Sequence, residues 1–386
     1  MSNNKNLKRG WAVWRFDQMV TNVNVRIDNP SESGMEHYVG LEHLDTDSLK
    51  IRRWGKPADV EATKLMFKKG DIIFGRRRAY QRKLGVAEFD GICSAHAMVL
   101  RAKPDVVLPE FLPFFMQSDL FMNRAVEISV GSLSPTINWK TMAVQEFALP
   151  PPEEQISAIK VLSAATDSCN AFEDAELAAS VLLQAIVDEA VNDDAAIETS
   201  LLDLCDLPIT YGIVQAGPNI TGGVPYIRVS DMTAGEQLCS DGMLRTSTEI
   251  AEKYKRSAVS TGDIVFALRG DVGLCRIVPA ELHGANLTQG TARISIADET
   301  TRTFVYWALR STLVRRQIER ASKGSTFKEV TLASLRNIRL RIPSAEVQLA
   351  YNQRATEVAN AVVLLRERTK NSRRLFADIR ASSFGG

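Results

Sequence analysis

The sequence has no long hydrophobic run, and both cysteine and histidine are scarce. No apolar stretch reaches the roughly 18 residues of a membrane-spanning helix, and the polar start MSNNKNLKRGW lacks the apolar core of a secretory signal. The five cysteines form no CxxC pair and only four histidines are present, which argues against a structural zinc site. We therefore expect a cytoplasmic protein with reduced thiols, without a membrane segment, a metal or a cofactor.

Motifs of common enzyme classes are also missing. There is no GxxxxGK[ST] phosphate loop, no HExxH, no GxSxG elbow and no Asn-Pro-Pro-aromatic or Asp-Pro-Pro-aromatic tetrapeptide of an adenine methyltransferase. Glu61, Lys64 and Asp71 suggest a nuclease centre at first sight, but they lack the acid-x-lysine spacing of common metal nucleases. Asp71 follows a glycine, where a carboxylate usually caps the turn. The sequence thus predicts no catalytic residue.

The sequence contains one unit that occurs twice. Tyr38-Val-Gly-Leu recurs as Tyr226-Ile-Arg-Val, at an offset of 188 residues. The pentapeptide GDIIF at 70–74 recurs as GDIVF at 262–266, at an offset of 192, and the later matches keep an offset of 193. A nearly constant offset along most of the chain indicates an internal duplication.

Each copy has the pattern of a mixed α+β domain followed by a long helix. The Gly-Asp turns lead into β-branched runs typical of strands, and 109–128 and 302–321 have helical apolar spacing. Prolines then precede two long amphipathic segments, as at helix starts. The predicted divisions are two globular parts and two long helices: 1–150, 151–194, 195–342 and 343–386.

The two long helices are expected to pair as an antiparallel coiled coil. Apolar residues recur at alternating spacings of three and four. The predicted seam includes Val161, Phe172, Leu182 and Ile186 in the first helix and Val358, Leu365, Leu375 and Ile379 in the second. Segment 153–194 has a net charge of −9 and segment 344–386 has +3. Antiparallel pairing would convert the tandem repeat into a pseudo-two-fold; the alternative is that each helix packs on its own globular part.

Basic residues gather after the first Gly-Asp strand and indicate a DNA-binding loop. The candidates are Arg76, Arg77, Arg78, Arg82 and Lys83, with Tyr80 among them, and Arg269 at the corresponding place in the second copy. Arginine forks match phosphate oxygens and guanine edges, while a solvated charged loop is the alternative.

A second shared loop, 131–138 and 323–328, combines glycine with hydroxyl and basic side chains. Its candidate phosphate contacts are Ser132 and Asn138 in the first copy and Lys323, Ser325, Thr326 and Lys328 in the second. A plain turn is the alternative. Where the first copy has His96, the second has Asn286, Thr288 and Gln289, and amide side chains are suited to reading adenine. His96 could equally be a structural histidine.

Taken in order, these features resemble the specificity (S) subunit of type I restriction-modification systems. The resemblance lies in the two GDI[IV]F strands, the stretch FDGICSAHAMVLRAK, the loops GSLSPTINW and GSTFKEVTL, and LPPPEEQ ahead of an amphipathic helix. It covers nearly the whole chain. One departure is IPSAEVQ, which replaces LPPPEEQ in the second copy.

The resemblance implies two target recognition domains that each read half of a split site in double-stranded DNA. It implies a coiled-coil ruler that docks two methyltransferase subunits, with restriction (motor-nuclease) subunits joining them. It also implies that this chain is not itself an enzyme. Two other classes stay open from the residues alone: a tandem-domain DNA-binding nuclease, and a protein-interaction adaptor without a DNA role.

Overall fold

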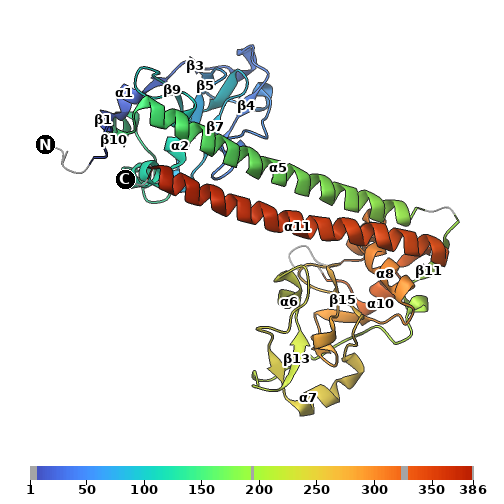
Figure 1. The fold of residues 1–386 in the computed structure, drawn as a ribbon. Helices are drawn as coiled ribbons and strands as arrows, with labels where there is room; N and C mark the ends of the chain where they lie inside the picture. Colours follow the sequence, from blue (N-terminus) through green and yellow to red (C-terminus); the bar gives the residue numbers. More distant parts are fainter. Residues whose placement is uncertain (1–6, 193–194, 323–328, 385–386) are drawn as a thin grey trace. The chain divides into compact units, whose positions relative to one another are not determined.

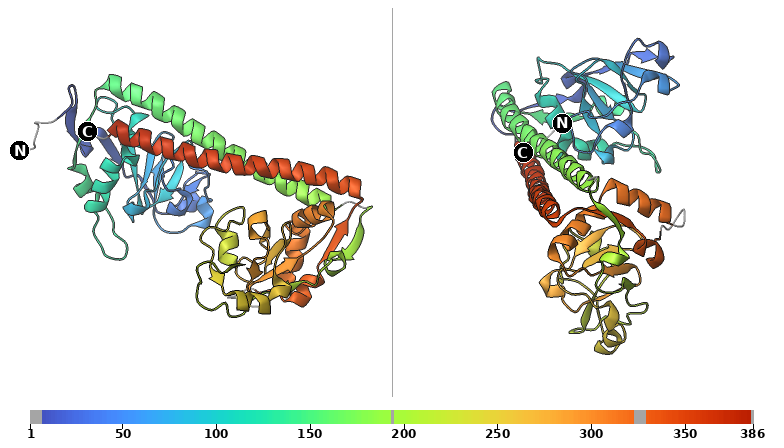
Figure 2. Two further views of the ribbon diagram at one scale, coloured as in Figure 1. Left: turned by 60° about the horizontal axis from the view of Figure 1, so that its bottom comes forward. Right: turned by 90° about the vertical axis from the view of Figure 1, so that its right-hand side faces the viewer.

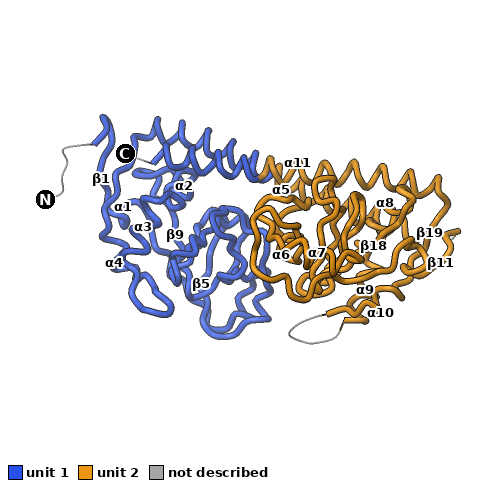
Figure 3. Tube along the Cα trace, turned by 90° about the horizontal axis from the view of Figure 1, so that it is seen from below, with its two compact units in different colours: residues 1–171, 370–386 blue, residues 172–369 orange. Residues whose placement is uncertain are grey.

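The computed structural model describes residues 7–192, 195–322 and 329–384. The chain divides into two compact units, shown in separate colours in Figure 3. Unit 1 comprises Met1–Ala171 with Lys370–Gly386, and unit 2 comprises Phe172–Thr369. Each unit therefore contains a globular part and a portion of both long helices. Among the described residues, no helix combines the length and the apolar character needed to cross a membrane.

The globular part of unit 1 is a set of small sheets backed by short helices. Its strands, in sheet order, are β2 (Val20–Val23), β9 (Ala97–Ala102), β6 (Ile72–Gly75) and β7 (Leu84–Val86); β3 (Arg26–Ile27), β5 (Lys64–Phe67), β8 (Gly91–Ser94) and β4 (Tyr38–Val39); and the pair β1 (Ala12–Arg15) and β10 (Glu146–Leu149). Its short helices are α1 (Phe16–Met19), α2 (Phe111–Gln117), α3 (Asp119–Glu127) and α4 (Trp139–Ala143). Strand β4 runs parallel to β8, and the other pairings are antiparallel.

The globular part of unit 2 has the same plan. Its strands are β12 (Thr210–Tyr211), β18 (Thr291–Ile294), β15 (Ile264–Ala267) and β16 (Cys275–Ile277); β14 (Arg245–Thr246), β13 (Val224–Ile227) and β17 (Asn286–Leu287); and the pair β11 (Ile197–Ser200) and β19 (Arg339–Ile342). Its short helices are α6 (Val229–Thr233), α7 (Thr248–Lys253), α8 (Glu299–Ala308), α9 (Thr312–Ala321) and α10 (Leu332–Arg336). The parallel pair is here β13 with β17. The expected α+β duplication is confirmed.

The Gly-Asp turns have the same backbone conformation and the same hydrogen bonding in both units. Gly70 and Gly262 have φ angles of 88° and 89°, a conformation that favours glycine. The Asp71 carboxylate accepts a hydrogen bond from the Lys68 backbone N–H at 2.8 Å, and Asp263 accepts one from Ser260 at 2.7 Å. These carboxylates therefore stabilise the turn that precedes β6 or β15.

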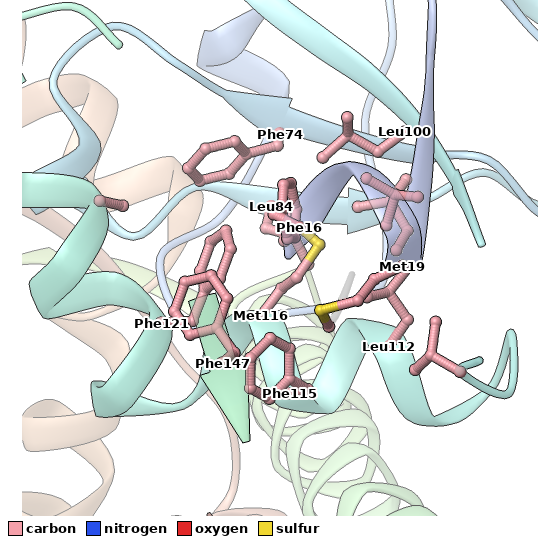
Figure 4. Packing of buried hydrophobic residues seen from close by; sticks show 14 of the residues in the cluster. Phe16, Met19, Phe74, Leu84, Leu100, Leu112, Phe115, Met116, Phe121 and Phe147 are labelled. Atoms are coloured by element: carbon pink, nitrogen blue, oxygen red, sulfur yellow. The ribbon is translucent and has the colours of Figure 1, made fainter. Parts of the chain in front are cut away.

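Aromatic packing dominates the core of unit 1. Figure 4 shows Phe74, Phe115, Phe121 and Phe147 converging on Phe16 from different elements. The ring of Phe121 lies 5.3 Å from that of Phe16 and 5.6 Å from that of Phe74, at the tilted or edge-on angles that aromatic pairs favour. This core holds β6 against helices α2 and α3 and so positions the loop that follows β6.

The long helices α5 (Pro152–Ala190) and α11 (Ala345–Phe384) run side by side and antiparallel (Figures 1 and 2). In unit 1 the first half of α5 meets the end of α11, where the Cys169 Sγ and Ser372 Oγ atoms are 3.1 Å apart. In unit 2 the end of α5 meets the start of α11, with Arg366 paired to Glu176 at 3.1 Å. The opposite charges predicted for the helices thus form ion pairs across the seam.

Both helices start alike, although their entry sequences differ. The Gln155 amide donates to the Pro150 carbonyl at 3.0 Å, and the Gln348 amide donates to the Pro343 carbonyl at 2.8 Å. These bonds satisfy a carbonyl at the point where the chain enters each helix. The weaker match of IPSAEVQ to LPPPEEQ therefore leaves the helix start unchanged.

The predicted seam residues fall into two groups, five that face the partner helix and three that face outward. Ile186 is buried, and Phe172, Val358, Leu365 and Ile379 are half-buried on the paired face. Val161, Leu182 and Leu375, by contrast, are 52%, 51% and 59% exposed, which corrects the prediction for these residues.

The inward-facing neighbours of these three residues lie one position further along: Leu162 is buried, and Leu183 and Phe376 are half-buried. Seven-residue repeats run through Gln155, Leu162, Cys169, Glu176, Leu183 and Ala190 and through Gln348, Ala355, Val362, Thr369, Phe376 and Ser383. Leu162 and Val362 lie on these repeats and are buried, as expected of the inward position of a heptad.

Candidate nucleic-acid interface

The two loops singled out in the first copy come together in unit 1. Residues 76–83 connect β6 to β7, and residues 130–137 lie beside the start of this connection. The Arg78 backbone N–H donates to the Pro135 carbonyl at 2.7 Å, and the Ile137 N–H donates to the Arg76 carbonyl at 3.0 Å. An antiparallel bridge joins Arg77 to Thr136. We call this joined pair of loops the two-loop surface of unit 1.

Ser134 organises the cations of this surface. Its hydroxyl oxygen accepts hydrogen bonds from the Nη2 atoms of both Arg77 and Arg78, each at 3.2 Å. The Arg76 guanidinium donates instead to the Ala95 carbonyl at 3.1 Å. These three side chains have no ion pair with a carboxylate among the described residues, so their positive charges are uncompensated and suited to an anionic partner.

Unit 2 repeats this arrangement with different side chains. Arg269 forms the antiparallel bridge with Glu329 that corresponds to Arg77 with Thr136, and the Val330 N–H donates to the Leu268 carbonyl at 3.0 Å. Here the arginine is neutralised, because its Nη2 lies 2.9 Å from Glu329 Oε1. The other candidates of this loop, Lys323, Ser325, Thr326 and Lys328, lie outside the described residues.

Not every basic residue of the first loop faces outward. Arg82 is held by Asp47 at 2.8 Å and by Asp119 at 3.0 Å, and the Lys83 ammonium donates to the Leu41 carbonyl at 2.7 Å. Arg82 and Lys83 thus have internal contacts in this structure, and the DNA-binding role predicted for them stays a prediction. Tyr80, between them, is 54% exposed and accessible to a ligand.

His96 lies among the cations of the two-loop surface. Partial burial lowers its pKa, and the positive charges of Arg77, Arg76 and Lys64 lower it further. The imidazole is exposed, and its backbone N–H donates to the Ser94 hydroxyl at 3.2 Å. In its neutral form the ring offers one donor and one acceptor, and either can contact a base edge.

The three candidates of the second copy differ sharply in exposure. Asn286 is only 1% exposed, and its amide donates to the Ala251 and Tyr254 carbonyls. It is thus a packing residue, which corrects its predicted role. The Thr288 hydroxyl donates to the Ile227 carbonyl at 3.3 Å, whereas the side chain of Gln289 is exposed.

The remaining candidates of unit 1 lie on loop 131–138. The Asn138 side chain caps α4 by accepting from the Lys140 N–H at 3.1 Å, so part of its function is structural. Ser132 is exposed beside Leu133, which is 90% exposed at the loop tip. Sequence reasoning missed Ser134 and Leu133, although Ser134-Pro135 is itself a turn signal.

The residues that suggested a nuclease centre are occupied by other partners. Asp71 is buried, and the Arg101 guanidinium donates to its two oxygens at 2.7 and 2.9 Å. The Lys64 ammonium donates to the Glu61 and Ala62 carbonyls. Over the described ranges of the chain, no group of three or more His, Cys, Asp or Glu side chains is arranged to hold a metal ion.

Several curated proteins are similar to this chain. The EcoBI specificity subunit of a type I restriction enzyme from Escherichia coli is 32% identical over 142 residues, which cover 36% of this chain and 30% of that protein. The EcoDI specificity subunit from the same organism is 26% identical over 156 residues, 40% of this chain and 34% of that protein. The chain thus spans about a third of the length of these two relatives.

A third relative matches over most of the chain. The putative MjaX specificity subunit of Methanocaldococcus jannaschii is 21% identical over 364 residues, 85% of this chain and 81% of that protein.

Solved structures share the fold. A chain from a type I R-M system superposes with a TM-score of 0.58 at 20% identity and 99% coverage of both chains. The S subunit of a type I restriction-modification system from M. genitalium superposes with a TM-score of 0.61 at 12% identity, covering 100% of this chain and 98% of that one. At these identities the likeness shows the fold alone. A family model, the type I restriction modification DNA specificity domain, matches residues 37–181 and 200–356, most of both repeats, and the chain belongs to this family.

Proposed function

We propose that this chain is the non-catalytic DNA-recognition subunit of a type I restriction-modification complex. Residues 1–150 and 195–342 would be its two target recognition domains, each reading one half of a split site in double-stranded DNA. Membership of the specificity family and the fold shared with an S subunit support this proposal. Both repeats match the family, as two readers require.

One observation carries the proposal: the same loop-to-loop junction is built twice with different side chains. Arg77 bridges to Thr136 in unit 1, and Arg269 bridges to Glu329 in unit 2. The backbone scaffold is common to both, while the groups it presents differ in charge and in hydrogen-bonding capacity. Such a pattern is expected of two readers of different DNA sequences, because specificity depends on the side chains that reach the base edges.

Phosphate contacts and base contacts would come from different residues of the two-loop surface. Arg77 and Arg78, oriented by Ser134 and without a carboxylate partner, suit the DNA backbone. His96 and Tyr80 lie near them and are exposed, which suits contact with bases or sugars. In unit 2 the exposed Gln289 is the corresponding candidate for reading adenine.

The outer faces of the paired helices support docking of partner subunits. Large apolar side chains are exposed along both helices: Ile156, Val161, Leu177, Val181, Leu182, Leu349, Val363, Leu364 and Leu375. Repeated exposed apolar residues on long helices are typical of protein interaction sites. We propose that two methyltransferase subunits dock here, that restriction subunits join through them, and that the helix pair sets the length of the unread gap.

Reconstitution separates this proposal from the two other classes. The chain is mixed with its cognate methyltransferase and host DNA, and methyl transfer from labelled S-adenosylmethionine is measured for each component and for the mixture. Site-specific transfer only in the mixture supports a specificity subunit. Strand cleavage by this chain alone with Mg²⁺ would refute it in favour of a nuclease, and the absence of DNA binding in every mixture would favour an adaptor.

A further inference from the structure

Unit 2 contains a cavity whose counterpart in unit 1 is filled by the protein itself. The cavity has a volume of about 490 Å³ and is bounded by α5, by the loop 270–274 and by helices α8 and α9. A volume of this size is within the range of roughly 300–1,000 Å³ that is typical of small-molecule sites. The duplication allows each wall of the cavity to be compared with the equivalent residue of unit 1.

Two arginine side chains are absent from unit 2 at this place. The backbone hydrogen bond between Gly75 and Lys83 in unit 1 corresponds to that between Ala267 and Leu274 in unit 2. The residue before Lys83 is Arg82, with a φ of 51°, and the residue before Leu274 is Gly273, with a φ of 92°. Arg82 of unit 1 therefore corresponds to Gly273 of unit 2. On the long helices, at the offset of 193, Arg380 of α11 corresponds to Val187 of α5.

Arg82 and Arg380 meet in unit 1. Both guanidinium groups contact Asp47 Oδ1, at 2.8 and 3.2 Å, and Arg82 also donates to the Gln117 carbonyl. They occupy the space between the end of α11 and the loop that follows β6. Unit 2 has glycine and valine at the same two positions, and both residues line its cavity.

The walls of the unit 2 cavity carry hydrogen-bond donors that lack acceptors. Arg310, at the position of Gln117, and Arg315 both line it, and neither forms an ion pair among the described residues. Arg310 instead lies over the rings of Tyr306 and Trp307, at 4.8 and 5.5 Å.

The buried donors are neutral as well as charged. The Trp307 indole N–H and the Gln184 amide N–H are both buried without a hydrogen-bond partner, and the Trp307 residue as a whole is only 7% exposed. A buried donor without an acceptor is costly, so an acceptor-bearing occupant would stabilise the site.

We infer that this cavity is a binding site for a small organic anion that bears a phosphate or carboxylate group. The acidic group would bind at the inner end, between Arg310, Trp307 and Gln184, because the two acidic lining residues, Asp271 and Glu319, are exposed. The apolar portion of the ligand would pack on Leu183, Val187 and Ile318. In unit 1 the protein fills the equivalent space with Arg82 and Arg380 around the Asp47 carboxylate. In unit 2 the arginines form the wall, and the ligand would supply the anionic group.

The test is calorimetric titration of the full chain with two probes of the two chemistries, AMP and 1-naphthoate, and with inorganic phosphate as the anion without an apolar part. We expect at least one organic probe to bind with a Kd on the order of 10–100 µM, as for a modest small-molecule site. Phosphate alone should bind at least about tenfold more weakly, since it leaves the apolar wall uncovered. AMP binding alone would identify a phosphate site, and 1-naphthoate binding alone a carboxylate site.

Three variants localise the binding. Arg310→Gln, which introduces the residue found in unit 1, should weaken binding at least about tenfold, and Val187→Phe should block it by filling the cavity. Arg316→Gln, on α9 next to the lining residue Arg315 but outside the cavity, should bind as the parent chain does. Circular dichroism confirms that each variant is folded. Failure of both organic probes to bind at 1 mM would overturn the inference. So would a probe affinity in Arg310→Gln and Val187→Phe that equals the affinity of the parent chain.

Discussion

The phase of the helix seam can be tested at two adjacent residues, Val161 and Leu162, which are alike in chemistry and opposite in environment. Leu162 is 0% exposed and belongs to the core of unit 1, whereas Val161 is 52% exposed. Leu162→Ala removes buried methylenes and leaves a cavity, which typically costs about 2–5 kcal/mol. Val161→Ala removes little buried surface and replaces a β-branched residue by the best helix former, so it should be neutral or stabilising by up to about 0.6 kcal/mol.

Urea unfolding followed by tryptophan fluorescence measures this difference in the right unit. Of the five tryptophans, Trp11, Trp14, Trp54 and Trp139 belong to unit 1, and Trp307 alone belongs to unit 2. With an m-value of about 2 kcal/mol/M, Leu162→Ala should lower the midpoint of the main transition by about 1–2.5 M. A shift for Val161→Ala as large as that for Leu162→Ala would refute the seam described here.

Three further predictions concern the interface and the helices. Arg77→Gln should weaken DNA binding and reduce the slope of log K against log salt by about 0.9, as loss of one phosphate contact does; Arg82→Gln, whose guanidinium is held internally, should lower stability by about 1–3 kcal/mol and leave the slope unchanged. The pKa of His96, lowered by burial and by nearby arginines, should rise when DNA phosphates approach, so binding should tighten as pH falls towards 6. Leu182→Asp should abolish methyltransferase docking in a pull-down with little loss of stability, whereas Leu183→Asp should destabilise unit 2.

Each of these expectations has a contrary result. Equal salt slopes for the parent and Arg77→Gln would remove that residue from the phosphate contacts. An NMR titration should place the imidazole pKa of His96 below about 6.5 in the unbound chain. Because the folded value is then below the unfolded one, stability should decline as pH falls below about 6.5; an unchanged imidazole pKa on DNA binding would contradict its place at the interface. Intact docking of Leu182→Asp would exclude that part of the helix face.

The sequence predicted what depends on local chemistry and on repetition. The Gly-Asp turns, the strands that follow them and the two long helices all carry local signals, and the offset of 193 showed that the second copy repeats the first. The seam phase was ambiguous because the pairs Val161-Leu162 and Leu182-Leu183 are both apolar, so a pattern of threes and fours fits either member. Only packing against the partner helix selects the inward residue.

The sequence could not predict the surroundings of a candidate residue where these depend on residues far away in the sequence. Arg82 looked like its neighbours until the fold brought Asp47 and Asp119 to it. Asn286 looked like a base reader, but the carbonyls of Ala251 and Tyr254 lie against its amide. Polar side chains find such partners only in the folded chain, and burial then removes them from the surface.

The central claim is that each globular part reads one half of the DNA site independently. The most direct measurement is to exchange residues 1–150 for those of a relative with another specificity, and to map the methylated bases in the genome of a host that carries the cognate methyltransferase. We predict that one half of the recognised sequence changes, while the other half and the length of the gap stay the same. A change in both halves would contradict the two-reader account.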